Sequence, residues 1–369
     1  MDTSDPEITF DADGISSHWY EFQQARRGQV PSGEDAKIAL SRIVDEVKRT
    51  GRGKDYDCVL GLSGGVDSSY LAHLAVELGL RPLVVHFDNG WNSELAVSNI
   101  ENLVKGLHLD LHTFVMDWLE FRDLQRAYFK ASVVDLEVPT DHMILGALYE
   151  VAQQHGLKFL LSGTNVVTEA ILPRSWYFSK FDLRNLRDIH RQFGTLPLRK
   201  LPALGFWQLI YYEQIHRIGS VSLLDLVEYN KSDAKKLLAE RYGWRDYGGK
   251  HYESVFTRFY QGYILPTKFN IDKRRAHLSS LICAGQLTRE EALQELERAT
   301  YEPALQVEDK RYVAKKLGFS DEEFAKVLAL PNRRHEEFET DTHLRKRYFR
   351  LLAAARPIRL AVKRLTARR

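Results

Sequence analysis

Short apolar runs alternate with longer amphipathic segments through the first half of the chain. Four runs of strand length predict buried strands, at residues 56–62, 81–87, 109–116 and 157–161. The segments between them carry apolar residues at helical spacing and predict helices at 68–78, 93–107, 117–132 and 142–154. We therefore predict an α/β fold with a doubly wound, mostly parallel sheet, in which ligands lie beyond the carboxyl ends of the strands.

The sequence on either side of this alternating region has a different pattern. Ahead of it, Glu7–Phe10 predicts a short strand, Asp11–Gly14 a turn and Glu34–Lys48 a helix. Behind it, the chain predicts a mainly helical C-terminal region, with capping-box spacing at Thr288 and Ser320. We place boundaries that divide the chain into residues 1–50, 51–200, 201–340 and 341–369.

A glycine-rich loop joins the first predicted strand of the sheet to the helix that follows it. Its sequence is Ser63-Gly64-Gly65-Val66-Asp67-Ser68-Ser69. The glycines permit a tight turn that points several backbone N–H groups at one place, and the helix N-terminus adds partial positive charge. An anion such as phosphate is the natural occupant. The Gly-Lys-Ser/Thr ending of the Walker loop is missing.

The loop resembles the Ser-Gly-Gly-x-Asp-Ser motif of the ATP pyrophosphatase (N-type) superfamily, which includes the synthetases for GMP, NAD, asparagine and argininosuccinate. This resemblance implies an adenine nucleotide alpha hydrolase-like domain in residues 51–200, with ATP and Mg²⁺ as cofactors. It also implies that the loop holds the pyrophosphate part of ATP while an acceptor oxygen attacks the α-phosphorus. Ser63 and Asp67 are the catalytic candidates within the loop.

Further candidate residues follow the other predicted strands at the same edge of the sheet. In this superfamily the segment around His86 and Asp88 contacts the nucleoside, although Asp88 is also a common turn residue. Carboxylate oxygens suit Mg²⁺, so Asp141 is a candidate magnesium ligand. An acid in the first turn of a helix also stabilises the helix dipole, and Asp141 fits this structural role as well. The expected nucleotide contacts are Ser63, Gly64, Gly65, Asp67, Ser68, Ser69, His86, Asp88, Gly163, Thr164 and Asn165. The expected magnesium ligands are Asp67, Asp141 and Glu169.

Four separated segments resemble one branch of this superfamily, the N-acetyl sugar amidotransferases of lipopolysaccharide and nonulosonic acid synthesis. They are Asp2–Asp11, Val85–Glu94, Gly248–Ser254 and Arg275–Ile282. The resemblance implies a nucleotide-linked or acidic sugar whose acetamido group becomes an acetamidino group, as in O-antigen synthesis. Within the third segment, His251 and Glu253 complete the catalytic candidates, because they lie in a polar cluster among aromatic residues and a histidine can transfer a proton near neutral pH.

The paired N-terminal cysteines of that family, which resemble a zinc-binding knuckle, are missing from this sequence. Ser16 and Trp19 stand where the second pair is expected, and His18 alone cannot complete a site of about four ligands. Two explanations stay open: the chain folds without zinc there, or its true start lies upstream. We expect no stoichiometric zinc.

The implied reaction consumes ammonia, because ammonia must displace AMP from the adenylated amide. A glutaminase would need an activated cysteine. Cys58 lies on an apolar strand and Cys283 in an apolar run, and both fit structural thiols of a reducing compartment. The resemblance therefore implies a separate glutaminase partner that delivers the ammonia.

Charge and hydropathy narrow the classes of function. The net charge of +2 gives no case for nucleic acid, no apolar run reaches membrane-spanning length, and no signal peptide is visible, so we expect a cytoplasmic protein. From Leu344 onward, however, the tail holds ten Lys or Arg residues and no acid. It suits peripheral contact with an anionic membrane, or packing on the parent domain. Two alternatives stay open: a tRNA-modifying enzyme that uses the same adenylation step, and a non-catalytic ATP-binding subunit.

Overall fold

The computed structural model describes residues 1–248 and 252–350. Within them, one sheet is formed by β1 (Cys58–Gly61), β2 (Pro82–Asp88), β3 (Leu111–Val115), β4 (Phe159–Leu161) and β5 (Gly219–Val221). Its order is β3-β2-β1-β4-β5 and all neighbouring strands are parallel. The predicted α/β fold class is confirmed. Because the chain runs from β1 to β2 and β3 and then returns to the other side of β1, the strand order reverses between β1 and β4.

Helices surround this sheet and continue beyond it. Those up to β5 are α1 (Ser17–Gln29), α2 (Gly33–Gly51), α3 (Val66–Glu77), α4 (Glu94–Leu107), α5 (Trp118–Ala131), α6 (Val138–Gln154), α7 (Val166–Glu169), η1 (Arg174–Trp176), α8 (Leu183–Phe193), α9 (Phe206–Ile210) and η2 (Tyr211–Ile215). Those after it are η3 (Leu223–Leu226), α10 (Lys231–Tyr242), α11 (Val255–Phe259), η4 (Tyr260–Ile264), α12 (Leu265–Phe269), α13 (Lys273–Cys283), α14 (Arg289–Glu297), α15 (Pro303–Leu317), α16 (Asp321–Leu328) and η5 (His335–Glu337).

The central strand β1 is covered on both faces. Cys58 and Leu60 belong to an apolar cluster shared with α2, α3 and α4. Val59, between them, belongs to a different cluster shared with α6. All three residues have no exposed surface. Successive side chains of a strand point to opposite faces, so a strand buried on both faces has a continuous apolar sequence, which is the pattern that predicted it.

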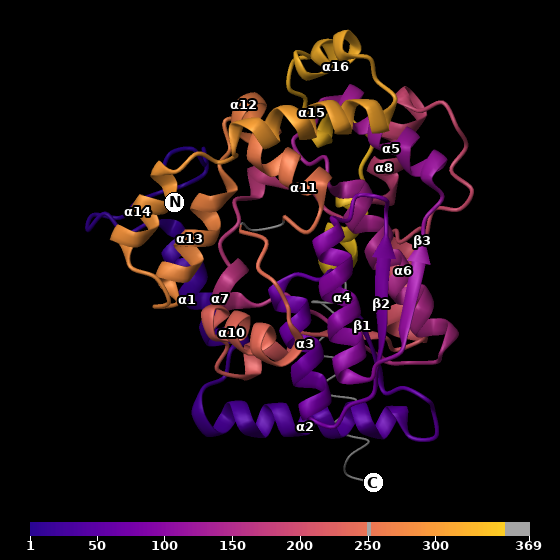
Figure 1. The fold of residues 1–369 in the computed structure, drawn as a ribbon, viewed down its shortest axis with the longest axis vertical. Coiled ribbons are helices and arrows are strands. Elements are labelled where there is room, and N and C mark those ends of the chain that lie inside the picture. The colour runs from indigo at the N-terminus through magenta and orange to yellow at the C-terminus, as the bar shows by residue number, and fades with distance from the viewer. Residues whose placement is uncertain (249–251, 351–369) are drawn as a thin grey trace.

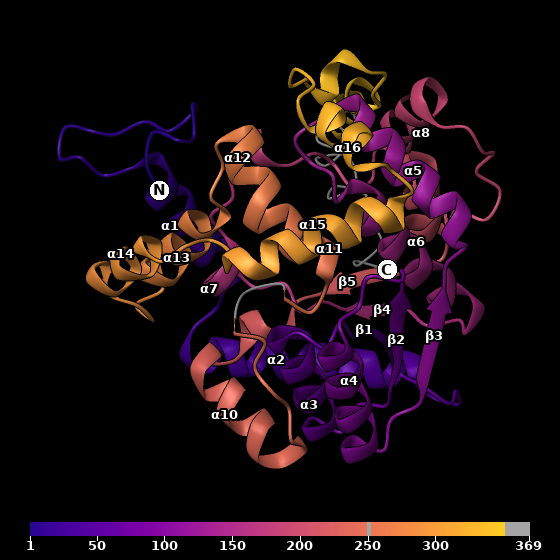
Figure 2. The ribbon, with the colours of Figure 1, turned by 45° about the horizontal axis from the view of Figure 1, so that its top comes forward.

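The C-terminal helices pack against the sheet half through α5. Figures 1 and 2 show α11, α12 and α15 together, with α13 and α14 beside the N-terminal helix α1. Phe129 of α5 contacts the rings of Phe256, Phe319 and Phe324, which come from three C-terminal segments. Because this core is continuous, the C-terminal helices hold fixed positions relative to the sheet.

Two secondary-structure predictions were wrong. Glu7–Phe10 is not a strand: Glu7 ends a turn, the next two residues have no regular structure, and Phe10 makes only an isolated bridge to Ser16. The short edge strand β5 was missed within a region predicted as mainly helical, because three residues that include Gly219 give no apolar alternation. Helix α6 also begins four residues ahead of its predicted start. Pro139 fits its first turn, where a proline's missing N–H costs nothing.

The N-terminal segment is held by the buried His18, which was judged from the sequence unable to complete a zinc site alone. Nε2 of His18 lies 2.7 Å from a carboxylate oxygen of Asp5, and its Nδ1 lies 3.1 Å from one of Glu21. Both ring nitrogens therefore already have partners. Asp5 is buried as well, so this contact fixes the start of the chain against α1.

No helix within the described residues has the length and apolar character required to cross a membrane. Residues 351–369 of the basic tail lie outside the described residues. Residues 342–350 are helical, with Leu344 and Phe349 exposed. The membrane contact of the tail stays a prediction.

Candidate functional site

The glycine-rich loop lies between β1 and α3, at the reversal of strand order. Gly64 has a φ of +84°, which a side chain would strain, and its carbonyl accepts hydrogen bonds from Trp244 Nε1 (2.9 Å) and Tyr247 Oη (2.8 Å). A Cβ at this position would lie 2.9 Å from Tyr247 Oη. The loop shape is thus fixed both by glycine and by two aromatic donors far along the chain.

The serine hydroxyls of the loop form a connected set. Ser63 Oγ lies 3.1 Å from Ser68 Oγ and accepts a hydrogen bond from Gly65 N at 3.3 Å. Gly65 is the N-cap of α3, and no side chain caps that helix terminus. Ser69 Oγ is buried and has no hydrogen-bond partner within the described part of the chain. Uncapped N–H groups and hydroxyl donors at one helix N-terminus suit an anion, as the sequence predicted.

Asp67, in the first turn of α3, contacts two residues that follow β5. Tyr229 donates a hydrogen bond of 2.5 Å to Oδ1, and Lys231 Nζ lies 3.6 Å from Oδ2. Burial, and then the Asp67 carboxylate, raise the pKa of Tyr229, so the phenol remains a proton donor. Sequence analysis missed both partners. One available signal was the position of Lys231 at the start of α10, where a cation opposes the helix dipole.

The loop after β4 packs directly on the glycine-rich loop. A Cβ at Gly163 would lie 3.2 Å from the Ser68 backbone nitrogen, so the close approach requires glycine. Thr164 Oγ1 lies 2.8 Å from Ser162 Oγ, and Asn165 caps α7 by accepting a hydrogen bond from Thr168 N at 2.9 Å. The two predicted phosphate segments therefore meet, with Thr164 at the exposed side and Asn165 buried.

The three predicted magnesium ligands occupy two different environments. Asp67 accepts a hydrogen bond from Tyr229, and Glu169 ends α7, which follows the loop packed on the glycine-rich loop. Asp141 instead pairs with Lys180 Nζ at 3.0 Å, and Lys180 also pairs with Asp135 at 2.7 Å. In the described part of the chain, no three His, Cys, Asp or Glu side chains form a group able to hold a metal ion. The assignment of all three as magnesium ligands stays a prediction.

The segment after β2 is held by its own hydrogen bonds. His86 Nδ1 donates to the Leu62 carbonyl at 3.0 Å, which leaves Nε2 to accept from the Asn92 amide at 3.0 Å. Asp88 accepts a hydrogen bond of 2.9 Å from Gly90 N, as in the turn considered from the sequence. His86 is buried, and its role toward the nucleoside stays a prediction.

Glu253 lies beside the glycine-rich loop although it is 188 positions later than Gly65. A Cβ built at Gly65 would lie 3.7 Å from Glu253 Oε1. The backbone carbonyl of Glu253 accepts a hydrogen bond from Ser93 N at 2.8 Å, which ties the segment around Glu253 to the loop after β2. His251, the other catalytic candidate of this segment, lies outside the described residues.

Neither cysteine has the environment of a nucleophile. Cys58 is buried in β1, and burial raises the pKa of its thiol. Burial also raises the pKa of Cys283, which packs at the edge of the main apolar cluster. A thiol with a raised pKa forms little thiolate near neutral pH.

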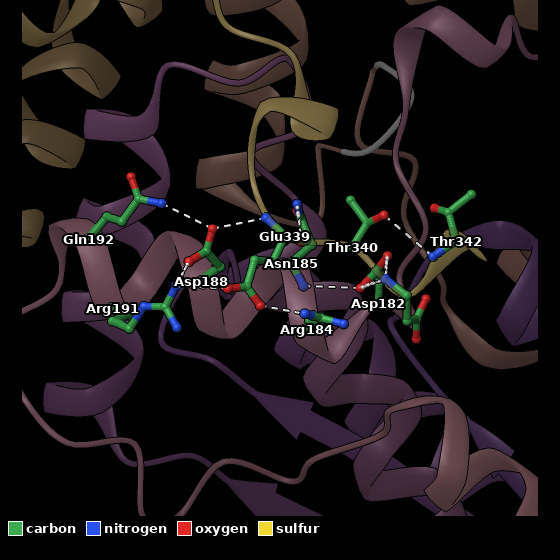
Figure 3. A network of polar contacts seen from close by, with 10 residues as sticks. Asp182, Arg184, Asn185, Asp188, Arg191, Gln192, Glu339, Thr340 and Thr342 are labelled. Carbon is green, nitrogen blue, oxygen red and sulfur yellow. Dashed lines mark hydrogen bonds and ion pairs between the residues drawn. The ribbon is translucent and has the colours of Figure 1, made fainter. Parts of the chain in front are cut away.

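Two cavities lie away from the loop, on either side of the helical residues 342–350. One of about 450 Å³ is lined by α8, the start of α9 and Leu344, and one of about 570 Å³ by Ser179 and residues of 342–350. Figure 3 shows the polar network beside the first cavity. There Asp188 and Asp182 of the α8 region accept the backbone N–H groups of Glu339 and Asp341. This network anchors the C-terminal segment to α8.

Residues 253–353 match the family model described as LPS biosynthesis protein WbpG-like, C-terminal domain. The match confirms, for that part of the chain, the resemblance to lipopolysaccharide biosynthesis proteins drawn from the sequence. A search of curated proteins gives no match.

Many solved structures have a detectable likeness to this chain, and three of them illustrate it. An NH3-dependent NAD synthetase from Campylobacter jejuni is 14% identical over 81% of this chain and 98% of its own, with a TM-score of 0.34. An NMN synthetase from Francisella tularensis is 16% identical over 59% and 89%, with a TM-score of 0.29. A predicted subunit of tRNA methyltransferase from Methanocaldococcus jannaschii is 17% identical over 50% and 74%, with a TM-score of 0.29. TM-scores this low carry no argument about activity.

Proposed function

We propose that this chain, whose residues 253–353 match the model of WbpG-like lipopolysaccharide biosynthesis proteins, is an ATP-dependent amidotransferase. Its substrate is an N-acetylated sugar linked to a nucleotide. The acetamido oxygen attacks the α-phosphorus of ATP and pyrophosphate leaves. Ammonia then attacks the activated carbon, and AMP leaves with the former amide oxygen. The product is an acetamidino sugar.

The observation that carries this proposal is the position of the loop Ser63–Ser69. It joins β1 to α3 beside β4, where the strand order reverses and where open parallel sheets bind ligands. The uncapped α3 terminus and the serine hydroxyls supply donors for a pyrophosphate. Charge that develops on a leaving pyrophosphate is stabilised by donors that are already in place.

The acidic residues Asp67 and Glu169 suit magnesium bound together with phosphate. Asp67 lies in the first turn of α3 and Glu169 ends α7, beyond the loop packed on the glycine-rich loop, and Mg²⁺ prefers one or two carboxylates plus phosphate oxygens and water. The ion would neutralise phosphate charge when ATP is bound. Lys231, 3.6 Å from Asp67, adds a cation on the same side.

Glu253 is the group best placed to accept a proton from the attacking ammonia. Its carboxylate is close to Gly65 of the glycine-rich loop. We propose that it accepts a proton from the attacking ammonia, together with His251. The ammonia comes from a separate glutaminase subunit, since burial raises the pKa of both thiols of this chain.

The test uses purified protein with ATP, magnesium, ammonium and a panel of nucleotide-linked acetamido sugars. We expect AMP and pyrophosphate in equal amounts, and a sugar that gains one nitrogen and loses one oxygen by mass spectrometry. If the acetamido oxygen carries ¹⁸O, the label should appear in AMP. Absence of AMP with every sugar would contradict the proposal, and AMP formed only with tRNA would favour the tRNA-modifying alternative.

A further inference from the structure

Lys316 of the C-terminal region lies beside two aromatic rings of the sheet half, Trp91 and Trp118, and one ring of its own helix, Tyr312. Lys316, near the end of α15, has its Nζ 4.8 Å from the ring centre of Trp91, 5.1 Å from that of Trp118 and 5.2 Å from that of Tyr312. The ammonium also donates hydrogen bonds to the Gly90 carbonyl and to Tyr312 Oη. An ammonium over several ring faces is attracted by their negative charge distribution.

Two of the residues that Lys316 contacts, Gly90 and Trp91, belong to the segment after β2, which was predicted to contact the nucleoside. Gly90 has a φ of +74°, and a Cβ there would lie 3.5 Å from Lys316 Nζ, so the turn and the lysine fit closely. Trp91 is 1% exposed, and its indole donates a hydrogen bond of 3.0 Å to Gln125. The Asp88–Trp91 turn is therefore anchored on one side by α5 and on the other by Lys316.

The same turn also sets the position of Glu253. Val255 N donates to the Trp91 carbonyl at 2.9 Å, and Ser93 N donates to the Glu253 carbonyl at 2.8 Å. Asn92 and Ser254 form an antiparallel bridge between these two bonds. A shift of the turn would therefore move the backbone of Glu253 with it.

We propose that Lys316 is a positioning residue that fixes the Asp88–Trp91 turn for ATP and, through it, Glu253. The proposal rests on the proposed function, because it assumes that ATP binds at this edge of the sheet. It assigns a role in nucleotide affinity to a residue of the C-terminal helix α15, which contacts the Asp88–Trp91 turn through Lys316.

Stabilisation of a helix end alone does not account for this arrangement. Lys315 and Lys316 both lie in the last turn of α15, where any cation favours the helix dipole. Lys315 is exposed and can serve that purpose, whereas Lys316 is partly buried among three rings. Lys315 therefore provides a matched control that removes the same charge from the same turn.

The experiment compares wild type with Lys316→Met, Lys316→Arg and the control Lys315→Met. Calorimetry measures the affinity for ATP with magnesium, and turnover gives KM for ATP and kcat. We expect Lys316→Met to weaken ATP binding and raise KM by about five- to tenfold, and to lower kcat as well, because the backbone position of Glu253 depends on the turn. Lys316→Arg, which keeps a cation over the rings, should restore most of the affinity, and Lys315→Met should match wild type. The tryptophan emission of Lys316→Met should also shift relative to Lys315→Met.

The outcomes separate this proposal from the one on which it rests. If wild type does not bind ATP, the proposed function fails. If wild type binds ATP and Lys316→Met binds it equally well, or if Lys315→Met weakens binding as much as Lys316→Met, the positioning role is refuted. Should Lys316→Met unfold, Lys316→Arg and Lys316→Gln still decide the matter, because equal ATP affinity in these two folded variants would contradict a need for the cation at its present place.

Discussion

Asp67 shows how far single residues could be predicted from the sequence. Its place in the Ser63–Ser69 motif predicted a position at the N-terminus of a helix, and α3 confirms it. Its partners Tyr229 and Lys231 could not be predicted, because they reach it only when β5 pairs with β4. Local patterns thus predict which residues form a loop. They do not predict which distant side chains contact it.

The first prediction at this scale concerns the loop itself. We expect Asp67→Asn and Ser63→Ala to lower the rate of AMP formation by about 10²- to 10³-fold, because each removes a group aimed at charged phosphate or its magnesium. The folded state should survive, since Asp67 is partly exposed and Ser63 lies in a loop. The rate is measured by AMP release and the fold by circular dichroism. If both variants form AMP at the wild-type rate, the proposal that this loop binds ATP for catalysis is refuted.

The second prediction concerns Lys231. A lysine at the first position of α10 opposes the helix dipole, so its ammonium is better explained by an anion at the neighbouring α3 terminus. Lys231→Met should therefore weaken ATP binding by about tenfold, whereas Lys236→Met, on the same helix but exposed, should not change it. Calorimetric titration with ATP and magnesium measures both. If both variants weaken ATP binding equally, the effect comes from the overall positive charge of α10 and not from a contact between Lys231 and ATP.

At the scale of elements, apolar runs and helix caps predicted individual strands and helices, but they did not predict how distant parts of the chain pack together. The central strands, α3 to α5 and the capping boxes at Thr288 and Ser320 are confirmed, because each depends on residues close together in sequence. The packing of residues 335–345 on α8 could not be predicted, since its contacts join residues about 150 positions apart. That packing depends on buried polar groups, which have no periodic pattern.

This anchor leads to a prediction about pH. Asp182 accepts backbone N–H groups from Asn185 and Asp341, and its burial, with the nearby Asp341 carboxylate, raises its pKa to about 6. Between its ordinary pKa of 3.8 and about 6, the folded protein keeps a proton that the unfolded chain has released. This group therefore destabilises the fold progressively as pH rises through that range.

Replacement of Asp182 by asparagine should remove this dependence. We expect the melting temperature of Asp182→Asn minus that of wild type to increase as pH rises from about 4 to about 7. Differential scanning calorimetry measures it, with Asp233→Asn, an exposed acid, as the control. If the melting temperature of Asp182→Asn minus that of wild type stays constant or decreases with rising pH, ionisation of Asp182 does not destabilise the folded protein.

At the scale of the whole molecule, the fold class could be predicted but the arrangement of its two halves could not. The alternation of strands and helices specified the parallel sheet, whereas the C-terminal helices reach the site through α5 and through backbone bonds between residues 91–93 and 253–255. Glu253 was chosen from sequence as a catalytic candidate. Its place beside Gly65 follows only from that packing.

The last prediction follows from this arrangement and concerns the source of nitrogen. Cys58 is buried between β1 and the helices α2, α3 and α4, and burial raises the pKa of each of the two thiols, so neither suits the attack on glutamine. We expect the purified chain to use ammonium and not glutamine, with turnover that increases with pH as ammonia replaces ammonium. Product formation with each nitrogen source, measured by mass spectrometry, checks this. A Cys58→Ala, Cys283→Ala double variant is the control and should keep ammonium-dependent turnover. Glutamine-supported turnover that this variant loses would show that a thiol of the chain is a glutaminase nucleophile, whereas glutamine turnover that appears only after a second protein is added would identify the partner that supplies ammonia.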